Sequence, residues 1–133
     1  MPLSAKFVKT QLELFKPLLT GSSLETARRG QDKLGELMAA TRRKDVTSEE
    51  HAFDMFEGAW LVPKDETRDG VVLYLHGGGY CCGDLAYAKG FGSILAAECG
   101  IRVFAAAYRL APEAMFPAAL DDAVTAYRLS LIH

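Results

Sequence analysis

Three consecutive glycines, Gly77 to Gly79, have the most specific chemical potential in this 133-residue sequence. They follow His76 and an apolar run from Val71 to Leu75, a pattern typical of a buried parallel strand that ends in an open loop. Glycine adopts backbone dihedral angles that are closed to residues with a Cβ, and it lets a ligand reach the amide groups directly. A row of such N–H groups can bind the negative charge that develops on oxygen during acyl transfer.

Two further motifs follow the glycines. They are Y-R-L-A-P-E at Tyr108 to Glu113 and F-P-A-A-L-D-D at Phe116 to Asp122. Together with H-G-G-G-Y at His76 to Tyr80, they resemble the hormone-sensitive-lipase-like branch of the α/β-hydrolases, in which H-G-G-G forms part of the oxyanion hole. The resemblance covers residues 46 to 129 by motifs and residues 1 to 45 only by position. It implies a serine esterase or lipase-like enzyme that cleaves small, short-chain carboxylic esters.

The resemblance also implies roles for the loop residues. By position, Gly78 and Gly79 are expected to donate two hydrogen bonds to the oxyanion. Gly77 is expected to permit the turn and to belong to the substrate-binding set. Tyr80 and Asp84 flank the loop and are further candidates for contact with the substrate.

Other residues are expected to support this loop. His76 directly precedes the glycines, so we expect it to hydrogen-bond to backbone and hold the loop open. The resemblance agrees, because the family's catalytic histidine comes from a later part of the chain. Arg109 and Glu113 lie four residues apart and can form an ion pair that braces the loop after the second strand. The adjacent Cys81 and Cys82 are not expected to act as nucleophiles, since no second histidine motif lies nearby.

The nucleophile that this chemistry needs is missing from the sequence. A serine esterase of this fold carries a G-x-S-x-G motif, followed by an acid and a histidine, and no G-x-S-x-G occurs here. The family's catalytic domain is roughly twice as long as this chain. We therefore expect the N-terminal portion of a hydrolase, inactive by itself. The alternatives are a noncatalytic module that holds a small carbonyl ligand and a purely structural fragment.

A βαβ unit is expected to position the glycine loop. Ala86 to Cys99 is predicted to be a helix with Phe91, Ile94 and Leu95 turned inward, and Asp84 can cap it. Arg102 to Tyr108 is predicted to be a second buried strand, parallel to the first. Pro117 is expected to open a last helix, with Asp121 and Asp122 in its early turns near the positive end of the helix dipole.

The residues before this unit suggest two helices and a strand pair. Residues 5 to 16 have a helical period, and Ser22 with Glu25 has the spacing of a capping box for a helix that reaches about Arg43. The apolar residues Leu24, Ala27, Leu34 and Met38 recur on one face of that second helix. Val46 to Pro63 is predicted to form an antiparallel pair at the sheet edge, with a turn at Glu57-Gly58.

The fold class predicted from these elements is α/β, a partial α/β-hydrolase fold with a mixed, mostly parallel sheet. Residues 1–45 are assigned to N-terminal cap helices, which in the family cover the mouth of the active site. Residues 46–133 are assigned to the N-terminal part of the hydrolase core. The strands at Val71 and Val103 belong mid-sheet in such a core, so we expect an apolar strand edge that needs a companion chain, a C-terminal remainder or a second copy.

The composition limits the classes of binding partner that we expect. The formal charge of −2 gives no reason to expect nucleic acid, and no apolar run is long enough to span a membrane. The N-terminus lacks the pattern of a signal peptide, so a cytoplasmic location is expected. The three cysteines are expected to be reduced. No metal and no cofactor are predicted, and the expected ligand is a small-molecule ester.

Overall fold

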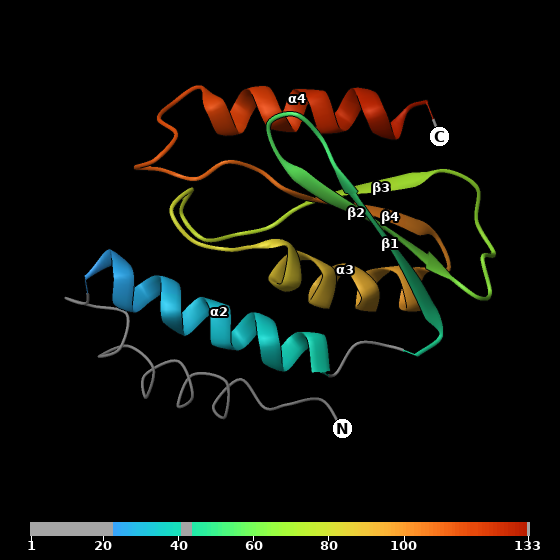
Figure 1. Cartoon of the computed structure of the whole chain (residues 1–133). Coiled ribbons are helices and arrows are strands. Elements are labelled where there is room, and N and C mark those ends of the chain that lie inside the picture. The colour runs from blue at the N-terminus through green and yellow to red at the C-terminus, as the bar shows by residue number, and fades with distance from the viewer. Residues whose placement is uncertain (1–22, 41–43, 133) are drawn as a thin grey trace, which may run out of the picture.

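The computed structural model describes residues 23–40 and 44–132, and the helix predicted for residues 5 to 16 lies outside them. The described elements are α2 (Leu24–Ala40), β1 (Val46–Ala52), β2 (Glu57–Pro63), β3 (Val71–Leu75), α3 (Leu85–Cys99), β4 (Arg102–Ala107) and α4 (Ala118–Ser130). Figure 1 shows that α4 covers one face of the sheet and α3 covers the other, while α2 lies on the far side of α3.

The described strands form one mixed sheet in the order β1-β2-β4-β3. β3 and β4 are parallel, with Val72 opposite Val103, and α3 connects them as predicted. β1 pairs antiparallel with β2, and β2 pairs antiparallel with β4. β4 is therefore an interior strand, whereas β1 and β3 form the two edges of the described sheet.

The turn between β1 and β2 differs from the prediction. Glu57 and Gly58 belong to β2, and the turn occupies residues 53–56, where the Phe53 amide donates to the Phe56 carbonyl at 2.9 Å. A glycine is needed at position 58 because β2 passes close to Phe104: a Cβ there would lie 2.7 Å from the Phe104 ring. Here the glycine serves packing between strands and does not form a turn.

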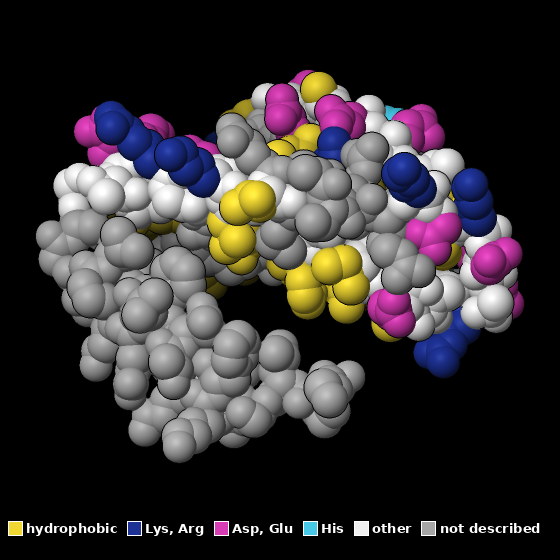
Figure 2. Space-filling model, turned by 90° about the horizontal axis from the view of Figure 1, so that it is seen from below, with side chains coloured by type: hydrophobic (Ala, Val, Ile, Leu, Met, Phe, Trp, Pro, Cys, Tyr) yellow, Lys and Arg dark blue, Asp and Glu magenta, His cyan; other side chains and the backbone are white. Residues whose placement is uncertain are grey.

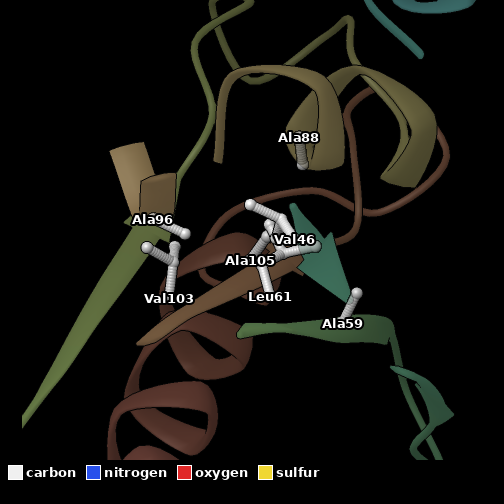
Figure 3. Packing of buried hydrophobic residues seen from close by; sticks show 7 residues of the cluster. All are labelled: Val46, Ala59, Leu61, Ala88, Ala96, Val103 and Ala105. Carbon is white, nitrogen blue, oxygen red and sulfur yellow. The ribbon is translucent and has the colours of Figure 1, made fainter. Parts of the chain in front are cut away.

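The core between the sheet and α3 consists of small and branched side chains. Figure 3 shows this cluster, whose members are Val46, Ala59, Leu61, Ala88, Ala96, Val103 and Ala105. Phe91 and Ile94, predicted to point inward, are 40% and 38% exposed, although the Phe91 ring packs against Tyr74 of β3 with centroids 5.4 Å apart. α3 instead approaches the sheet through small residues; at Gly92, for example, a Cβ would lie 2.6 Å from Leu61 Cδ1. Leu95 packs against the cluster while partly buried.

α2 faces the rest of the protein with a different side from the one predicted. Leu24 and Leu34, assigned to its packing stripe, are exposed, as is Leu37. Ala27 is half-buried, and the burial of Met38 lies outside the description. Among the α2 residues whose burial is described, Gly35 is buried, and a Cβ there would lie only 3.1 Å from the Tyr87 backbone nitrogen. Figure 2 views the molecule from the side on which α2 lies, and hydrophobic side chains are visible there beside charged ones.

The capping box predicted from Ser22 and Glu25 involves Ser22, which lies outside the described residues. Next to it, the Oγ of Ser23 accepts a hydrogen bond from the Thr26 amide at 3.3 Å. Glu25 forms an ion pair with Arg29. Ser23 therefore caps the first turn of the described helix.

α4 packs on the opposite face of the sheet with few buried residues. Ala126 joins Phe56, Phe104 and Ala106 in a second cluster. Four exposed apolar residues recur at helical spacing on the side of α4 near the β3 edge: Leu120, Val124, Tyr127 and Leu131. We refer to these four residues as the α4 strip. No helix within the described residues is long and apolar enough to cross a membrane.

Candidate oxyanion site

The two parallel strands end at the same edge of the sheet. β3 leads into the glycine loop, residues 76–83, and β4 leads into a second loop, residues 108–113. The two loops are joined directly, because the Ala111 amide donates to the Tyr80 carbonyl at 2.8 Å. The carboxyl ends of parallel strands are where α/β folds place their ligand sites.

The backbone of the glycine loop favours glycine at several positions, among them Gly78 and Gly79. Gly78 has φ +142° and Gly79 has φ +62°. A Cβ at Gly78 would lie 2.0 Å from the Cys82 carbonyl oxygen, so no side chain fits there. At Gly77, by contrast, a Cβ would meet nothing within 4 Å, so the turn itself is made by Gly78 and Gly79. The role expected for Gly77 in permitting the turn is therefore not supported by its surroundings.

Several carbonyl groups of this loop accept hydrogen bonds, whereas the amides of Gly78 and Gly79 donate none within the described residues. The Gly77 carbonyl accepts from Gln31 Nε2 at 3.1 Å, and the Gly78 carbonyl accepts from the amides of Cys81 and Cys82, each at 3.1 Å. Among the described residues, no hydrogen bond has the amide of Gly78 or Gly79 as its donor. Neither amide belongs to a β-ladder.

The loop borders a cavity of about 390 Å³, which we call the glycine cavity. It is lined by Leu75, His76, Gly77, Gly78, Gly79, Tyr80, Tyr108, Ala119, Leu120 and Ala123. The cavity therefore lies between the glycine loop and the first turns of α4. Its walls are mostly apolar apart from backbone amides and two tyrosines, a lining typical of small-molecule sites.

His76 lies beneath the loop and is almost fully buried, with 3% exposure. Its ring stacks on Tyr108 with centroids 4.4 Å apart, and its Nδ1 lies 3.0 Å from the Gly77 carbonyl oxygen. The Tyr108 hydroxyl donates to the His76 carbonyl. Burial raises the pKa of the Tyr108 hydroxyl, so the proton that makes this hydrogen bond is retained at neutral pH. His76 and Tyr108 thus brace the start of the glycine loop.

Tyr80 and Asp84 lie in different surroundings. Tyr80 lines the glycine cavity, is 67% exposed and has φ +61°, which is unusual for a residue with a side chain. Asp84 does not line the cavity, and its carboxylate accepts from the Tyr87 amide at 2.7 Å, capping α3 as predicted. The structure brings Tyr80, but not Asp84, to the glycines.

The ion pair predicted between Arg109 and Glu113 is not formed. Arg109 instead pairs with Asp122, which is only 2% exposed; Arg109 Nη2 lies 2.7 Å from Asp122 Oδ1. The Arg109 backbone amide also donates to Asp122 Oδ2 at 2.8 Å. The hydrogen bond to Asp122 raises the pKa of Arg109. The Asp122 carboxylate, which we expected to interact with the helix dipole, therefore anchors the second loop to α4.

Glu113 pairs with Arg28 of α2, a residue that the sequence patterns did not single out. Arg28 Nη1 lies 2.6 Å from Glu113 Oε1, and this guanidinium lowers the pKa of the Glu113 carboxyl to about 2. Arg28 also donates to the carbonyls of Cys81 at 2.7 Å and Ala111 at 2.8 Å. No local spacing links residue 28 to residues 81 and 111, so only the tertiary structure shows this contact.

The cysteines beside the loop are free thiols, and Cys99 is free as well. Burial raises the pKa of Cys82, which lowers its thiolate fraction at neutral pH. Cys81 and Cys82 serve the loop through their backbone amides. Within the described part of the chain, no group of three His, Cys, Asp or Glu side chains is arranged to hold a metal ion.

Comparison with known proteins agrees with this architecture. Residues 72–132 match the alpha/beta hydrolase fold family. An esterase from the bacterial hormone-sensitive lipase family has a similar structure, with a TM-score of 0.74 and 31% identity over 100% of this chain and 44% of the other. The chain carries a partial α/β-hydrolase fold. It resembles the esterases of the hormone-sensitive lipase family.

Two characterised relatives are ester hydrolases by name. The versiconal hemiacetal acetate esterase of Aspergillus parasiticus is 32% identical over 116 residues, which are 83% of this chain and 37% of the relative. The ethyl acetate hydrolase of Pseudomonas putida is 49% identical over 57 residues, which are 43% of this chain and 18% of the relative. The chain thus spans well under half the length of these relatives, and its similarity is to carboxylic ester hydrolases.

Proposed function

We propose that this chain supplies the oxyanion-binding loop of a serine carboxylesterase that cleaves small, short-chain esters. The observation that carries the proposal is the pair of amides at Gly78 and Gly79, which have no acceptor among the described residues and border the glycine cavity. Gly78 is half-buried and Gly79 is exposed, so a ligand in the cavity can reach both amides. Two unpaired donors beside a cavity fit a ligand that brings its own acceptor, such as a carbonyl oxygen.

In this role the chain stabilises charge and does not attack the substrate. When a serine oxygen adds to the ester carbonyl, the carbonyl oxygen becomes an anion, and the two amides donate to it. Loss of one such donor costs about 3 kcal/mol of transition-state stabilisation. His76 holds the loop from below, whereas the serine, its acid and its histidine come from residues outside this sequence, which has no G-x-S-x-G.

The glycine cavity supports a small acyl group. Its volume of about 390 Å³ is at the lower end of small-molecule sites, and Leu75 and Leu120 provide apolar walls. Gly77 and Tyr80 would contact the substrate there, whereas Asp84 caps α3 outside the cavity and would support the end of the loop. The names of the two relatives both refer to acetate esters, which agrees with a short acyl chain.

The exposed β3 edge and the α4 strip suggest that another polypeptide segment packs against this chain. The β3 edge has no neighbour in the described sheet, and the α4 strip is exposed beside it. Both would be covered by the polypeptide that supplies the serine, as a continuation or as a companion chain. A second copy of this chain is the alternative occupant. We assign residues 1–45 to an N-terminal cap segment, whose described helix α2 contacts the glycine loop from the side opposite the glycine cavity. The three free cysteines favour a cytoplasmic location.

The test begins with the coding DNA beyond codon 133, or with the natural protein's intact mass, to find the polypeptide that carries G-x-S-x-G. The assembled protein should hydrolyse p-nitrophenyl acetate and butyrate faster than the octanoate. A fluorophosphonate should label its serine, with loss of fluoride. The 133-residue chain alone should show only background turnover. Turnover by that chain after removal of contaminating hydrolases, or an unlabelled assembled protein, would refute the proposal.

The absence of G-x-S-x-G from the sequence favours one second candidate, a noncatalytic module. In that case the glycine cavity would hold a small carbonyl compound without cleaving it. Saturable binding of a short ester by the 133-residue chain, recovered intact by chromatography, together with no companion that carries a serine elbow, would favour this candidate over the esterase.

A further inference from the structure

We propose that Arg28 and Gln31 of α2 are positioning residues, which aim the Gly78 and Gly79 amides into the glycine cavity. The inference rests on the proposed function, because it concerns the same loop. Neither side chain lines the cavity, so neither is placed to touch a substrate there. Both act from the opposite side of the loop, through its carbonyl groups.

α2 is held against the loop by one face. Arg28, Gln31 and Gly35 are three and four residues apart, so they share a face of the helix. Gly35 lets the helix approach Tyr87 closely, since a Cβ there would lie 3.1 Å from the Tyr87 nitrogen. This close packing brings the two polar side chains to the glycine loop. This face of α2 therefore presents polar side chains to the glycine loop and a glycine to α3.

Gln31 sets the direction of the Gly78 amide. In a planar trans peptide, the carbonyl and the next amide point in opposite directions. The peptide between Gly77 and Gly78 is trans. Its carbonyl oxygen accepts from Gln31 Nε2 at 3.1 Å and also lies 3.0 Å from His76 Nδ1. The Gly78 N–H must then point away from α2. The side away from α2 is where α4 and the glycine cavity lie (Figure 1).

Arg28 sets the direction of the Gly79 amide through one further peptide. Its Nε donates to the Cys81 carbonyl at 2.7 Å, which fixes the peptide between Cys81 and Cys82. The amide of that peptide, on Cys82, donates to the Gly78 carbonyl at 3.1 Å. Fixing the Gly78 carbonyl directs the Gly79 N–H to the opposite side, into the cavity.

The guanidinium of Arg28 is itself fixed. It donates to Glu113 at 2.6 Å from two nitrogens and to the Ala111 carbonyl at 2.8 Å. These bonds use the planar fork of arginine in three directions, which a lysine ammonium cannot reproduce. Arg28 therefore ties the end of the glycine loop to the loop that follows β4.

Three substitutions test this assignment. Gln31→Ala removes the donor, and Gln31→Glu places a carboxylate oxygen against the Gly77 carbonyl in a side chain of equal size. Arg28→Lys keeps the charge but loses the fork. Arg29→Lys is the matched control, because Arg29 is on the same helix, 74% exposed and paired only with Glu25 among the described residues. Far-UV circular dichroism and the unfolding midpoint establish that each variant is folded.

The first readout is independent of esterase activity. Backbone ¹⁵N order parameters of Gly78 and Gly79 in the 133-residue chain should fall from about 0.85 to below about 0.6 in Gln31→Glu and Arg28→Lys. Gln31→Ala should give a smaller decrease, and Arg29→Lys none. Unchanged order parameters in both folded variants would overturn the positioning role. Should Gln31→Glu fail to fold, Arg28→Lys and Gln31→Ala decide the question.

The second readout uses the assembled esterase. Misplacing a catalytic group by about 1 Å can cost on the order of 100-fold in rate, so kcat should fall about 10- to 100-fold with KM nearly unchanged. A rise in KM as large as the fall in kcat would contradict the proposal that Arg28 and Gln31 act on binding of the oxyanion. If the order parameters change but the wild-type assembly shows no esterase activity, the proposed function fails while the positioning role of Arg28 and Gln31 stands.

Discussion

The two sides of the glycine loop differ in how completely they are paired. On the α2 side, the carbonyls of Gly77 and Cys81 accept hydrogen bonds from Gln31 and Arg28. On the α4 side, the amides of Gly78 and Gly79 have no acceptor among the described residues and border a cavity. The loop is thus fixed from one side so that its donors remain available on the other.

The two faces of the sheet show the same contrast on a larger scale. α3 is covered by α2 on its outer side and packs on the sheet through fully buried Ala88 and Ala96. In α4 only Asp122, Ala126 and Ser130 are buried, and the α4 strip is exposed. One face is therefore packed as a finished core, whereas the other presents a surface suited to a partner.

The largest expected effect tests what holds α4. Asp122→Ala would remove the buried carboxylate that binds the partly exposed Arg109 and should lower the free energy of unfolding by about 2 to 3 kcal/mol. The matched control is Asp121→Ala, whose exposed side chain should change stability by less than about 0.5 kcal/mol. Urea denaturation of both variants measures this difference. Equal effects would show that α4 is held by its apolar contacts and not by the ion pair.

A smaller effect compares packing on the two faces. Ala96→Val adds two methyl groups to a fully buried position and should cost about 1 to 3 kcal/mol through overpacking. Val124→Thr, on the α4 strip, should change stability by less than about 0.5 kcal/mol but reduce self-association. Denaturation and sedimentation velocity provide the two measurements. A large loss of stability in Val124→Thr would mean that the strip is already packed within this chain.

The next prediction concerns the strained residue of the loop. Tyr80 has φ +61°, and glycine would relieve a strain of about 1 kcal/mol. Tyr80→Gly should therefore be neutral or stabilising by up to about 1 kcal/mol, while binding of short esters by the assembled protein weakens because a cavity wall is lost. Thermal unfolding and KM for p-nitrophenyl butyrate check both parts. A destabilised variant with unchanged KM would assign Tyr80 to packing instead.

The smallest effect depends on pH. Because Arg28 lowers the pKa of Glu113 to about 2 from its ordinary 4.5, the stabilisation from this pair is fully present above pH 4.5. It should be lost as the pH falls from about 4.5 to about 2, as Glu113 takes up a proton. Comparing Glu113→Gln with wild type by urea denaturation from pH 7 to 2 should show the two curves converging at low pH. Parallel curves would exclude a role for this ionisation.

The sequence predicted the parts of the fold that depend on local patterns. The strand before His76 and the Asp84 cap each depend on neighbouring residues, and both form as expected. β3 is half-buried at the sheet edge, however, and not the buried strand that its apolar residues predicted. The predictions that failed concern contacts between distant residues. Arg109 was assigned to Glu113 because they are four apart, but Asp122 lies closer once α4 folds back on the sheet.

Helix faces were the least predictable feature. Phe91 and Ile94 of α3 are exposed because glycine and alanine positions allow the closest approach to the sheet. On α2 the apolar stripe that included Leu24 and Leu34 is exposed, and the face toward the protein carries Arg28 and Gln31. Their targets are backbone carbonyls, which leave no trace in a sequence pattern.

The most direct measurement is the response of the Gly78 and Gly79 amide protons to a tetrahedral adduct. A phosphonate bound to the serine of the assembled protein, verified by intact mass, would place an anionic oxygen where the ester oxygen would lie. We expect both amide resonances to move downfield when the adduct forms, while those of exposed glycines such as Gly30 stay in place. An adduct that leaves the Gly78 and Gly79 resonances unchanged would contradict their role as oxyanion donors.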